Sequence, residues 1–438
     1  MSVVAVTADR VPFGEAVRVW ARIGLLSFGG PAGQVALMHR ELVERRRWID
    51  DERFLHALNY CMLLPGPEAQ QLAIYLGWLL HRTLGGVVAG SLFVLPSVFI
   101  LWLLSYVYAA YGKLPWISAI FYGLKPAVTA IVVAAVIRIG HRALKGPVMW
   151  AIAGLAFAAI FFGKAPFPAI VFSAGVVGFA GARLWPSLFR RARPNESNDS
   201  PSEAVAVSAP GHARPSLGRA LRVATVCLVT WLTPTLVAGW LFGWQSTLFR
   251  EGLFFSKAAV VTFGGAYAVL PYVAQEAVNH FGWLHPGQML DGLGLAETTP
   301  GPLIMVVQFV GFMGAWQHPE TLAPIVAGTI GALLTTWATF APCFLWVLVG
   351  APYIERLRGH IGLTDALSAI TAAVVGVILN LAVWFALHVF FPEAGGVDYI
   401  AIGVCAVALF GLLRWKWNVV PVVLACALFG FCWKTIFP

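Results

Sequence analysis

Two short stretches decide the fold: Ser27-Phe28-Gly29-Gly30 and Thr262-Phe263-Gly264-Gly265. Each is followed by a Pro-Gly-Pro triplet, Pro65-Gly66-Pro67 after the first and Pro300-Gly301-Pro302 after the second. The offset between the copies is 235 residues throughout, from 27 to 262 and from 65 to 300. An ungapped duplication that keeps helix-breaking residues inside apolar segments predicts two related halves built from broken helices, a construction common in membrane transporters.

The composition predicts a chain that crosses a membrane several times. Of its 438 residues, 59% are hydrophobic and only 11% are charged, and the mean hydropathy is +0.79. Soluble domains carry about 25% charged residues. Residues 87–110, 366–387 and 399–413 with their flanks approach or exceed the roughly 20 apolar residues that span a bilayer. We therefore expect an all-α polytopic membrane protein whose N-terminus, which lacks the shape of a signal peptide, is retained.

The basic charge and the cysteines have simple interpretations. The formal net charge is +9, but Arg and Lys cluster in short loops, as the positive-inside rule describes. We therefore expect the lipid bilayer, and no nucleic acid, as a partner. The six cysteines lie in or beside apolar segments without a CxxC pair, so they are expected to be small buried hydrophobes, with no disulfide framework, metal or cofactor.

The chain divides into four parts by composition. Residues 1–188 form the first repeat, and residues 247–438 form the second. Residues 189–220 are rich in Pro, Ser and charge, so they predict a disordered cytoplasmic linker. Residues 221–242 are apolar and have no counterpart in the first repeat, so they predict a connecting transmembrane helix.

The repeat extends beyond the two motifs, with small gaps. The weaker matches pair 93–97 with 339–343, 129–140 with 371–381, and 168–179 with 421–431.

Charged loops indicate that the repeats have opposite orientations. Loop 39–53 contains five arginines, whereas its counterpart 274–288 contains no Arg or Lys. Loop 138–145 is also basic, whereas its counterpart 388–398 contains no Arg or Lys. The bias reverses in another pair of loops, where the second repeat has Arg356 and Arg358 and the first repeat has only Lys113. By the positive-inside rule, the two repeats are inverted relative to each other.

This orientation constrains the segments that carry the motifs. If loops 39–53 and 138–145 are both cytoplasmic, the chain between them crosses an even number of times. Residues 87–110 and 116–137 supply two crossings, so residues 54–80 must return to their own side.

The Pro-Gly-Pro triplet splits the returning segment into pieces of about 11 and 13 residues, or roughly 16 and 20 Å, each too short to span. A re-entrant hairpin follows, and the same reasoning applies to residues 13–42 with a tip at 28–31. We expect about 13 membrane elements in total, of which about nine cross fully and four are hairpins.

The hairpin tips are the predicted anion site. A half-helix that starts inside the membrane offers free N–H groups and the positive end of its dipole. A glycine lets a ligand approach the backbone closely, although Gly and Pro could also only kink helices or permit close packing. The predicted substrate-binding residues are Ser27, Phe28, Gly29, Gly30, Pro65, Gly66, Pro67, Gln70, Gln71, Thr262, Phe263, Gly264, Gly265, Thr299, Pro300, Gly301 and Pro302.

Charged residues near the tips predict coupling or gating. A carboxylate accepts but does not donate hydrogen bonds, so Glu68 and Glu297 are predicted to carry coupling protons or to gate the site. The alternative for both is a water-exposed hairpin end. Lys257 is predicted to act with them, whereas Lys125 is expected to snorkel to an interface.

Two equivalent glutamates have a structural explanation. Glu41 and Glu276 follow the two Phe-Gly-Gly segments and are expected to end helices with salt bridges. A metal set of His39, Glu41 and His56 is rejected because its spacing matches no compact ligand motif.

Several motifs resemble the chromate ion transporter family. They are SFGGP, WIDDERF, LPGPEAQQLAIYLG and GGxxAGxxFVLPS in the first repeat, and TFGGAYAVLPYV and TTPGPLI in the second. The resemblance implies a long-chain member with two homologous domains, multi-pass in the bacterial inner (plasma) membrane. It implies export of chromate from the cytoplasm, coupled to the proton motive force, and chromate resistance. Short members are single domains that work as pairs, and a homodimer of this chain stays open.

Other functions also stay open. Sulfate or another oxyanion is the alternative substrate, and a membrane-embedded enzyme or a non-transport assembly subunit is the alternative class. No nucleophile–base or metal signature favours an enzyme. The second repeat has Leu303-Ile304 where the first has Glu68-Ala69, so a coupling role is expected in one half only. The residues themselves predict an anion site, and only the resemblance names chromate.

Overall fold

A computed structural model describes residues 11–28, 30–112, 114–185, 216–353, 361–392 and 395–437. Gly29, most of the predicted linker, Lys113, Arg356 and Arg358 lie outside these ranges. Helices and short connections make up the described residues, which include no strand. The predicted all-α fold is confirmed.

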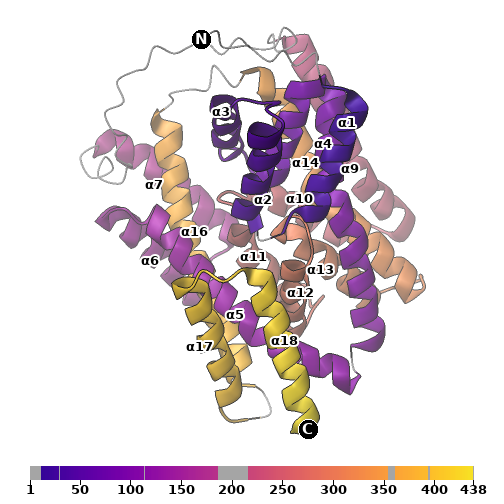
Figure 1. Cartoon of the computed structure of the whole chain (residues 1–438), viewed down its shortest axis with the longest axis vertical. Helices are drawn as coiled ribbons and strands as arrows, with labels where there is room; N and C mark the ends of the chain where they lie inside the picture. Colours follow the sequence, from indigo (N-terminus) through magenta and orange to yellow (C-terminus); the bar gives the residue numbers. More distant parts are fainter. Residues whose placement is uncertain are drawn as a thin grey trace.

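Residues 11–185, here called the first half, form two broken helix pairs and three further helices (Figure 1). The elements are α1 (Phe13–Leu26), α2 (Gly30–His39), η2 (Arg40–Arg45), α3 (Asp51–Cys61), α4 (Glu68–Tyr111), α5 (Pro115–Ala143), α6 (Pro147–Phe161) and α7 (Phe167–Leu184). Helix α4 is interrupted at His81 and Arg82, whose backbone dihedrals are not helical. Its first piece therefore covers residues 68–80.

Residues 247–437, here called the second half, repeat this order after a connecting helix, α9 (Leu217–Phe242). The elements are α10 (Thr247–Val261), α11 (Ala266–Gln275), η3 (Glu276–His280), α12 (Pro286–Thr298), η4 (Leu303–Met305), α13 (Val306–Gln317), α14 (Pro324–Gly350), η5 (Ala351–Tyr353), α16 (Ile361–Phe390), α17 (Tyr399–Arg414) and α18 (Val419–Ile436). Both halves are thus interrupted at the motifs that the sequence analysis singled out.

Six helices among the described residues are long and apolar enough to cross a membrane. They are 68–111, 115–143, 217–242, 324–353, 365–390 and 419–436. Four more apolar helices are shorter, among them α6 and α17 with 15 and 16 residues. At 1.5 Å per residue these two extend only about 22–24 Å, less than the roughly 30 Å hydrocarbon core. The chain is a multi-pass membrane protein, and the count of nine full crossings stays a prediction.

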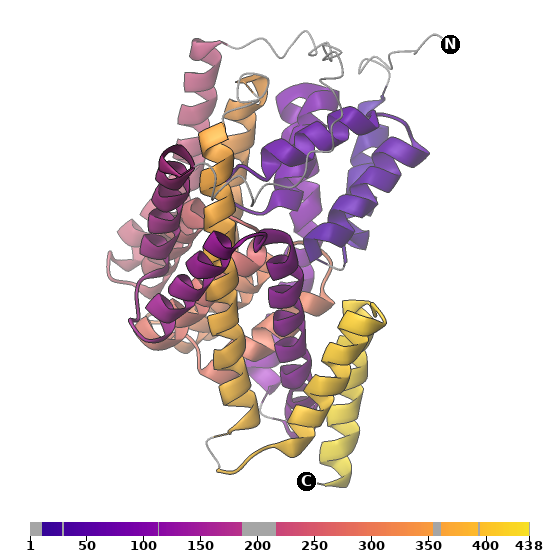
Figure 2. The ribbon, with the colours of Figure 1, turned by 90° about the vertical axis from the view of Figure 1, so that its left-hand side faces the viewer.

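The two halves exchange their last helices. Helices α6 and α7 of the first half pack on α16, whereas α17 and α18 of the second half pack on α5. Helices α5 and α16 also contact each other, and α14 packs against α4. The views in Figures 1 and 2 show α17 and α18, in yellow, at the end opposite α3. Because each half covers helices of the other, the two share one core.

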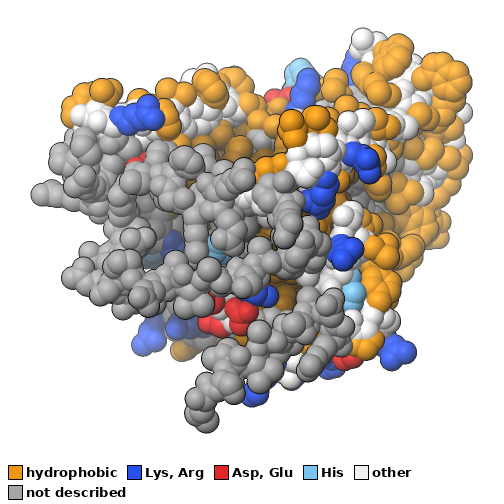
Figure 3. All heavy atoms as spheres, turned by 90° about the horizontal axis from the view of Figure 1, so that it is seen from above, with side chains coloured by type: hydrophobic (Ala, Val, Ile, Leu, Met, Phe, Trp, Pro, Cys, Tyr) orange, Lys and Arg blue, Asp and Glu red, His pale blue; other side chains and the backbone are white. Residues whose placement is uncertain are grey.

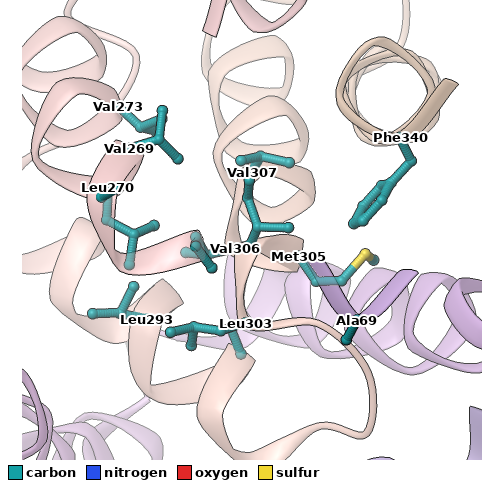
Figure 4. Close-up of a cluster of buried hydrophobic side chains, with 14 of the residues drawn as sticks. Ala69, Val269, Leu270, Val273, Leu293, Leu303, Met305, Val306, Val307 and Phe340 are labelled. Atoms are coloured by element: carbon teal, nitrogen blue, oxygen red, sulfur yellow. The ribbon is translucent and has the colours of Figure 1, made fainter. Parts of the chain in front are cut away.

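Apolar side chains fill the space around the second Pro-Gly-Pro break (Figure 4). Leu303 and Met305 of η4 and Val306 of α13 are almost completely buried. Figure 4 shows them beside side chains of four other helices: Ala69, Val269, Leu270, Val273, Leu293 and Phe340. Apolar side chains therefore pack around this break on several sides.

The glycines of both triplets require a positive φ. The φ angle is 122° at Gly66 and 103° at Gly301, a region that residues with a Cβ avoid. A Cβ at Gly66 would lie 2.9 Å from Cys343 Sγ, and one at Gly301 would collide with Ser97 Oγ. Ser97 and Cys343 occupy matching positions in the weaker 93–97 and 339–343 repeat.

Replacing Gly301 by alanine tests this constraint. We expect Gly301→Ala to lower the apparent Tm of the detergent-solubilised protein, because it adds about 1–2 kcal/mol of backbone strain and a collision with Ser97. Gly154→Ala on α6 is the matched control, since a Cβ there meets no atom within 4 Å. Equal melting temperatures for the two variants would contradict the prediction.

Candidate functional site

A cavity of about 830 Å³ penetrates the molecule between the two halves. Both ends of α2, Gly30 and His39, line it, so it extends along a helix about 15 Å long. At the His39 end, Arg142 near the end of α5 and Lys145 just beyond that helix also line it. Figure 3, which views the molecule from above, shows Lys and Arg side chains on that face and hydrophobic side chains along the flank. The cavity thus connects a basic face with the broken helices.

Two glutamates from different halves line this cavity. Glu68 is the first residue of α4, and Glu297 lies near the end of α12. The Tyr267 hydroxyl donates a 2.7 Å hydrogen bond to Glu297 Oε1. A Cβ on Gly265 would lie 3.5 Å from Glu68 Oε1, so this carboxyl lies over the second Phe-Gly-Gly break. The structure therefore brings the two predicted coupling glutamates into one cavity.

Several helices reach the cavity with their first residues, among them α2 and α11, which begin at or directly after the two Phe-Gly-Gly segments. The lining includes the first residues of α2, from Gly30 to Ala32, and of α11, from Ala266 to Tyr267. Phe263, Gly264 and Gly265 complete this surface. The first N–H groups of a helix have no acceptor within the helix, so both ends present donors and a positive dipole.

The Pro-Gly-Pro tips have a different role in this structure. The Gly66 N–H donates to Thr262 O at 2.7 Å, and the Gly301 N–H donates to Ser27 O at 2.6 Å. Each tip thus binds the Phe-Gly-Gly break of the other half, and we call these two bonds the crossed hydrogen bonds. Their N–H groups are engaged here, and binding of an anion by them stays a prediction.

The hydroxyls beside the breaks are also engaged. Ser27 Oγ donates to Ile23 O and Thr262 Oγ1 donates to Ala258 O, both at 2.6 Å. Each hydroxyl therefore satisfies the last turn of its own helix. Thr299 likewise donates to Ala296 O at 3.0 Å.

Side chains that the sequence analysis did not select support the breaks. Gln34 Nε2 donates to Gly301 O at 2.6 Å, and Ser97 Oγ donates to Pro300 O. Gln71, which the sequence analysis did select, supports the first triplet in a similar way, since its Nε2 donates to Pro65 O at 2.7 Å. The contacts of Gln34 and Ser97 join residues far apart in sequence, so no local signal marks these two side chains.

The predicted site residues fall into three groups. Those that line the cavity are Gly30, Phe263, Gly264, Gly265, Glu68 and Glu297. Those outside the lining, at or beside the breaks, are Ser27, Phe28, Pro65, Gly66, Pro67, Gln70, Gln71, Thr262, Thr299, Pro300, Gly301 and Pro302. Lys257 is also outside the lining, exposed on α10 beside the exposed Leu253 and Val260.

Several polar residues of the lining were missed, among them Arg138, Arg142 and Tyr267. Arg138 and Arg142 belong to the basic loop that the sequence analysis assigned to topology, yet both line the cavity. Arg138 also lies near enough to interact electrostatically with Glu297. Tyr267 was quoted only as part of a motif, although the first half has Ala32 at the equivalent position.

The predicted helix-ending salt bridges are confirmed. Glu41 accepts 2.6 Å hydrogen bonds from Arg45 and Arg46, and Glu276 pairs with His280 at 3.0 Å. Burial raises the pKa of the Glu41 carboxyl, but the hydrogen bonds and charges of Arg45 and Arg46 outweigh burial and hold the pKa below its usual value.

The geometry defines a helical membrane protein with paired broken helices around a central cavity. The chain belongs to the family described as Chromate transporter, whose sequence model matches residues 14–179 and 249–431. The resemblance noted in the sequence is therefore confirmed. No solved structure matches the chain.

Three relatives cover most of the chain. A chromate transport protein of Pseudomonas aeruginosa is 33% identical over 424 residues, 94% of this chain and 90% of that protein. A chromate transport protein of Cupriavidus metallidurans is 29% identical over 383 residues, 86% of this chain and 83% of that protein. A probable chromate transport protein of Synechococcus elongatus is 27% identical over 370 residues, 84% of this chain and 83% of that protein.

The Glu41 pair predicts a pH-dependent stability. A carboxyl whose pKa is lowered by folding adds stability above its unfolded pKa of about 4.3, and this stability is lost as the pH falls through the folded value. Glu41→Gln should therefore reduce stability by about 1–3 kcal/mol at neutral pH and by less in acid. Apparent Tm measured from neutral pH down to well below the unfolded pKa of about 4.3, where this stability is lost, checks this.

Glu276→Gln is the control, because its partner His280 is 67% exposed and the loss should be small. A Glu41→Gln deficit that stays constant or grows toward acid pH would contradict the assignment.

Proposed function

We propose that the protein exports chromate from the cytoplasm across the bacterial plasma membrane and so gives chromate resistance. The observation that carries the proposal is the cavity that connects the basic face with the two half-helix N-termini. The basic face is cytoplasmic by the positive-inside rule, so the cavity is open toward the cytoplasm. The family and the printed names of its relatives support chromate as the oxyanion.

The charges along the cavity suit a dianion. Arg138, Arg142 and Lys145 line the wall. Glu44, which also lines the basic end, pairs with His39 at 3.2 Å. Such a wall raises the local concentration of an anion and steers it inward. At the inner end the N-termini of α2 and α11 supply donors that require no buried cation.

Protonation of Glu68 and Glu297 would control the affinity of the cavity for an oxyanion. Two carboxylates repel a dianion placed beside them, and the repulsion is strong away from bulk water. Binding is therefore favoured when Glu68, Glu297 or both are protonated. A dianion that takes up one proton still carries net negative charge, so an inside-negative membrane potential drives it outward, by about 2.3 kcal/mol per charge for each 100 mV.

Inside-out membrane vesicles test the proposed transport. We expect wild-type vesicles to accumulate labelled chromate when they are energised, and Arg138→Gln to lower uptake about 10-fold or more, the usual range for a lost charged contact. Arg183→Gln is the matched control, because Arg183 contacts Phe179 and does not line the cavity.

Competition identifies the oxyanion. An excess of sulfate that leaves chromate uptake unchanged supports chromate as the substrate. Vesicles that accumulate sulfate but no chromate would reject chromate and favour the sulfate alternative. Vesicles that accumulate neither would reject transport and favour the assembly subunit.

The role of the glutamates predicts a pH dependence of binding. We expect the affinity of the purified protein for chromate to fall as the pH rises, because deprotonated glutamates repel the dianion. In the double variant Glu68→Gln with Glu297→Gln this dependence should be lost. Equilibrium binding measured at several pH values checks this, and Glu44→Gln at the basic end is the control. A double variant that keeps the wild-type pH dependence would assign the protons elsewhere.

A further inference from the structure

A second group of charges lies in the membrane region outside the cavity lining. Asp291 of α12 is buried and lies 3.8 Å from Lys125 Nζ of α5. The Tyr108 hydroxyl of α4 donates a 2.8 Å hydrogen bond to the other carboxylate oxygen of Asp291. We call Lys125, Asp291 and Tyr108 the outer cluster. It joins α4 and α5 of the first half to α12 of the second.

The outer cluster lies on the opposite side of the glutamates from the basic face. Along α5 the order is Lys125, then Ile131 at the inner part of the cavity, then Arg138 and Arg142 toward the basic end. Along α12, Asp291 precedes Glu297 by six residues, or about 9 Å. An oxyanion that enters from the basic face must therefore pass this level after the glutamates.

The interface between α5 and α12 is closed at this level. Gly294 lies between the cluster and Glu297, and a Cβ there would be 3.3 Å from Val128 and 3.6 Å from Leu124. Val128 is completely buried. A lysine and an aspartate face each other across this contact, and each would be costly to leave unpaired at such a depth.

The geometry of the Lys125–Asp291 pair also allows the two side chains to separate. Its 3.8 Å distance exceeds that of a hydrogen bond, and Asp291 Oδ1 is buried without a hydrogen-bond partner. Pro126, next to Lys125, lies inside α5, where it removes one helical hydrogen bond and provides a natural bend. Gly287 leaves room beside Lys125 Nζ, at 3.3 Å from an added Cβ.

We infer that Lys125 and Asp291 form the exit gate of the transport path, with Tyr108 orienting Asp291. This inference rests on the proposed transport function. While the cavity is open to the basic face, the ion pair holds α5 against α12. A dianion that moves beyond Glu297 competes with Asp291 for the Lys125 ammonium, and the separation of the pair opens the path to the other side.

Accessibility of residue 128 tests the gate. Val128→Cys places a thiol in the closed α5–α12 contact, and a membrane-impermeant maleimide is added to right-side-out vesicles. Mass spectrometry of the peptide that contains residue 128 reads the label without removal of the native cysteines. We expect little label in Val128→Cys alone and about tenfold more after Asp291→Asn or Lys125→Met, the scale of measured couplings between paired charges.

A similar group supplies the matched control. Asp398 accepts hydrogen bonds from Tyr122 of α5 at 2.9 and 3.0 Å, and Lys434 lies over the Tyr122 ring at 4.9 Å. Asp398→Asn thus removes an acid that pairs with a tyrosine and lies near a lysine, but it lies outside the α5–α12 contact. It should leave the label at residue 128 unchanged.

A charge exchange separates the gate from a general loss of packing. Lys125→Asp combined with Asp291→Lys restores the pair, so the label should return toward the level of Val128→Cys alone. Label that stays low in both single variants, or that rises equally in Asp398→Asn, would overturn the gate. Label that remains high in the exchanged variant would also overturn it. The labelling needs no substrate, so absence of chromate flux in wild-type vesicles would reject the proposed function by a separate result.

Discussion

The structure depends on how its interrupted backbones are satisfied away from water. A helix that ends inside a membrane leaves N–H and C=O groups that lipid cannot bind. Here the crossed hydrogen bonds, Gly66 to Thr262 and Gly301 to Ser27, connect each Pro-Gly-Pro tip with the break of the other half. Neither half alone can make them. A second copy of the repeat is therefore a structural requirement, because each repeat completes the backbone hydrogen bonds of the other.

This arrangement divides the work between the two kinds of motif. The glycine N–H groups of the Pro-Gly-Pro tips donate hydrogen bonds to the other half, so these tips hold the two halves together at the helix breaks. The N-termini of α2 and α11 face the cavity, where we propose that their N–H groups bind the anion. The backbone breaks occur at equivalent positions in the two repeats, but the side chains beside them differ. The residue equivalent to Glu68 is Leu303, and the residue equivalent to Tyr267 is Ala32. If the repeats are inverted, as the charged loops predict, they would provide a symmetric scaffold, and the proposed coupling to protons would involve one chemically distinct set of side chains.

Much of the fold could be predicted from the sequence because Pro and Gly break helices through their own local geometry. The triplet Pro65-Gly66-Pro67 predicted pieces of about 11 and 13 residues, and α3 has 11 residues while α4 stays helical until His81. The site was harder to predict. Arg138 and Arg142 have the same signature whether they set topology or line a cavity, and only the path of α5 distinguishes the two roles. Gln34 and Ser97 act through contacts more than 200 residues away, which no local pattern reveals.

The placement of charge along α5 connects these observations. This one helix carries Lys125 at the outer cluster, Ile131 near the glutamates, and Arg138 and Arg142 on the wall of the cavity. In the proposed mechanism, a dianion travelling along α5 would pass from the arginines, past helix N-termini, to the lysine. Of the carboxylates on this route, Glu44 pairs with His39 and Asp291 with Lys125, and protons are proposed to neutralise Glu68 and Glu297. Because α17 and α18 of the other half pack on α5, a movement of one half against the other also moves this row of charges. In the proposed mechanism, this exchange of helices would couple the protonation state of the glutamates to the outer cluster on the other side of them.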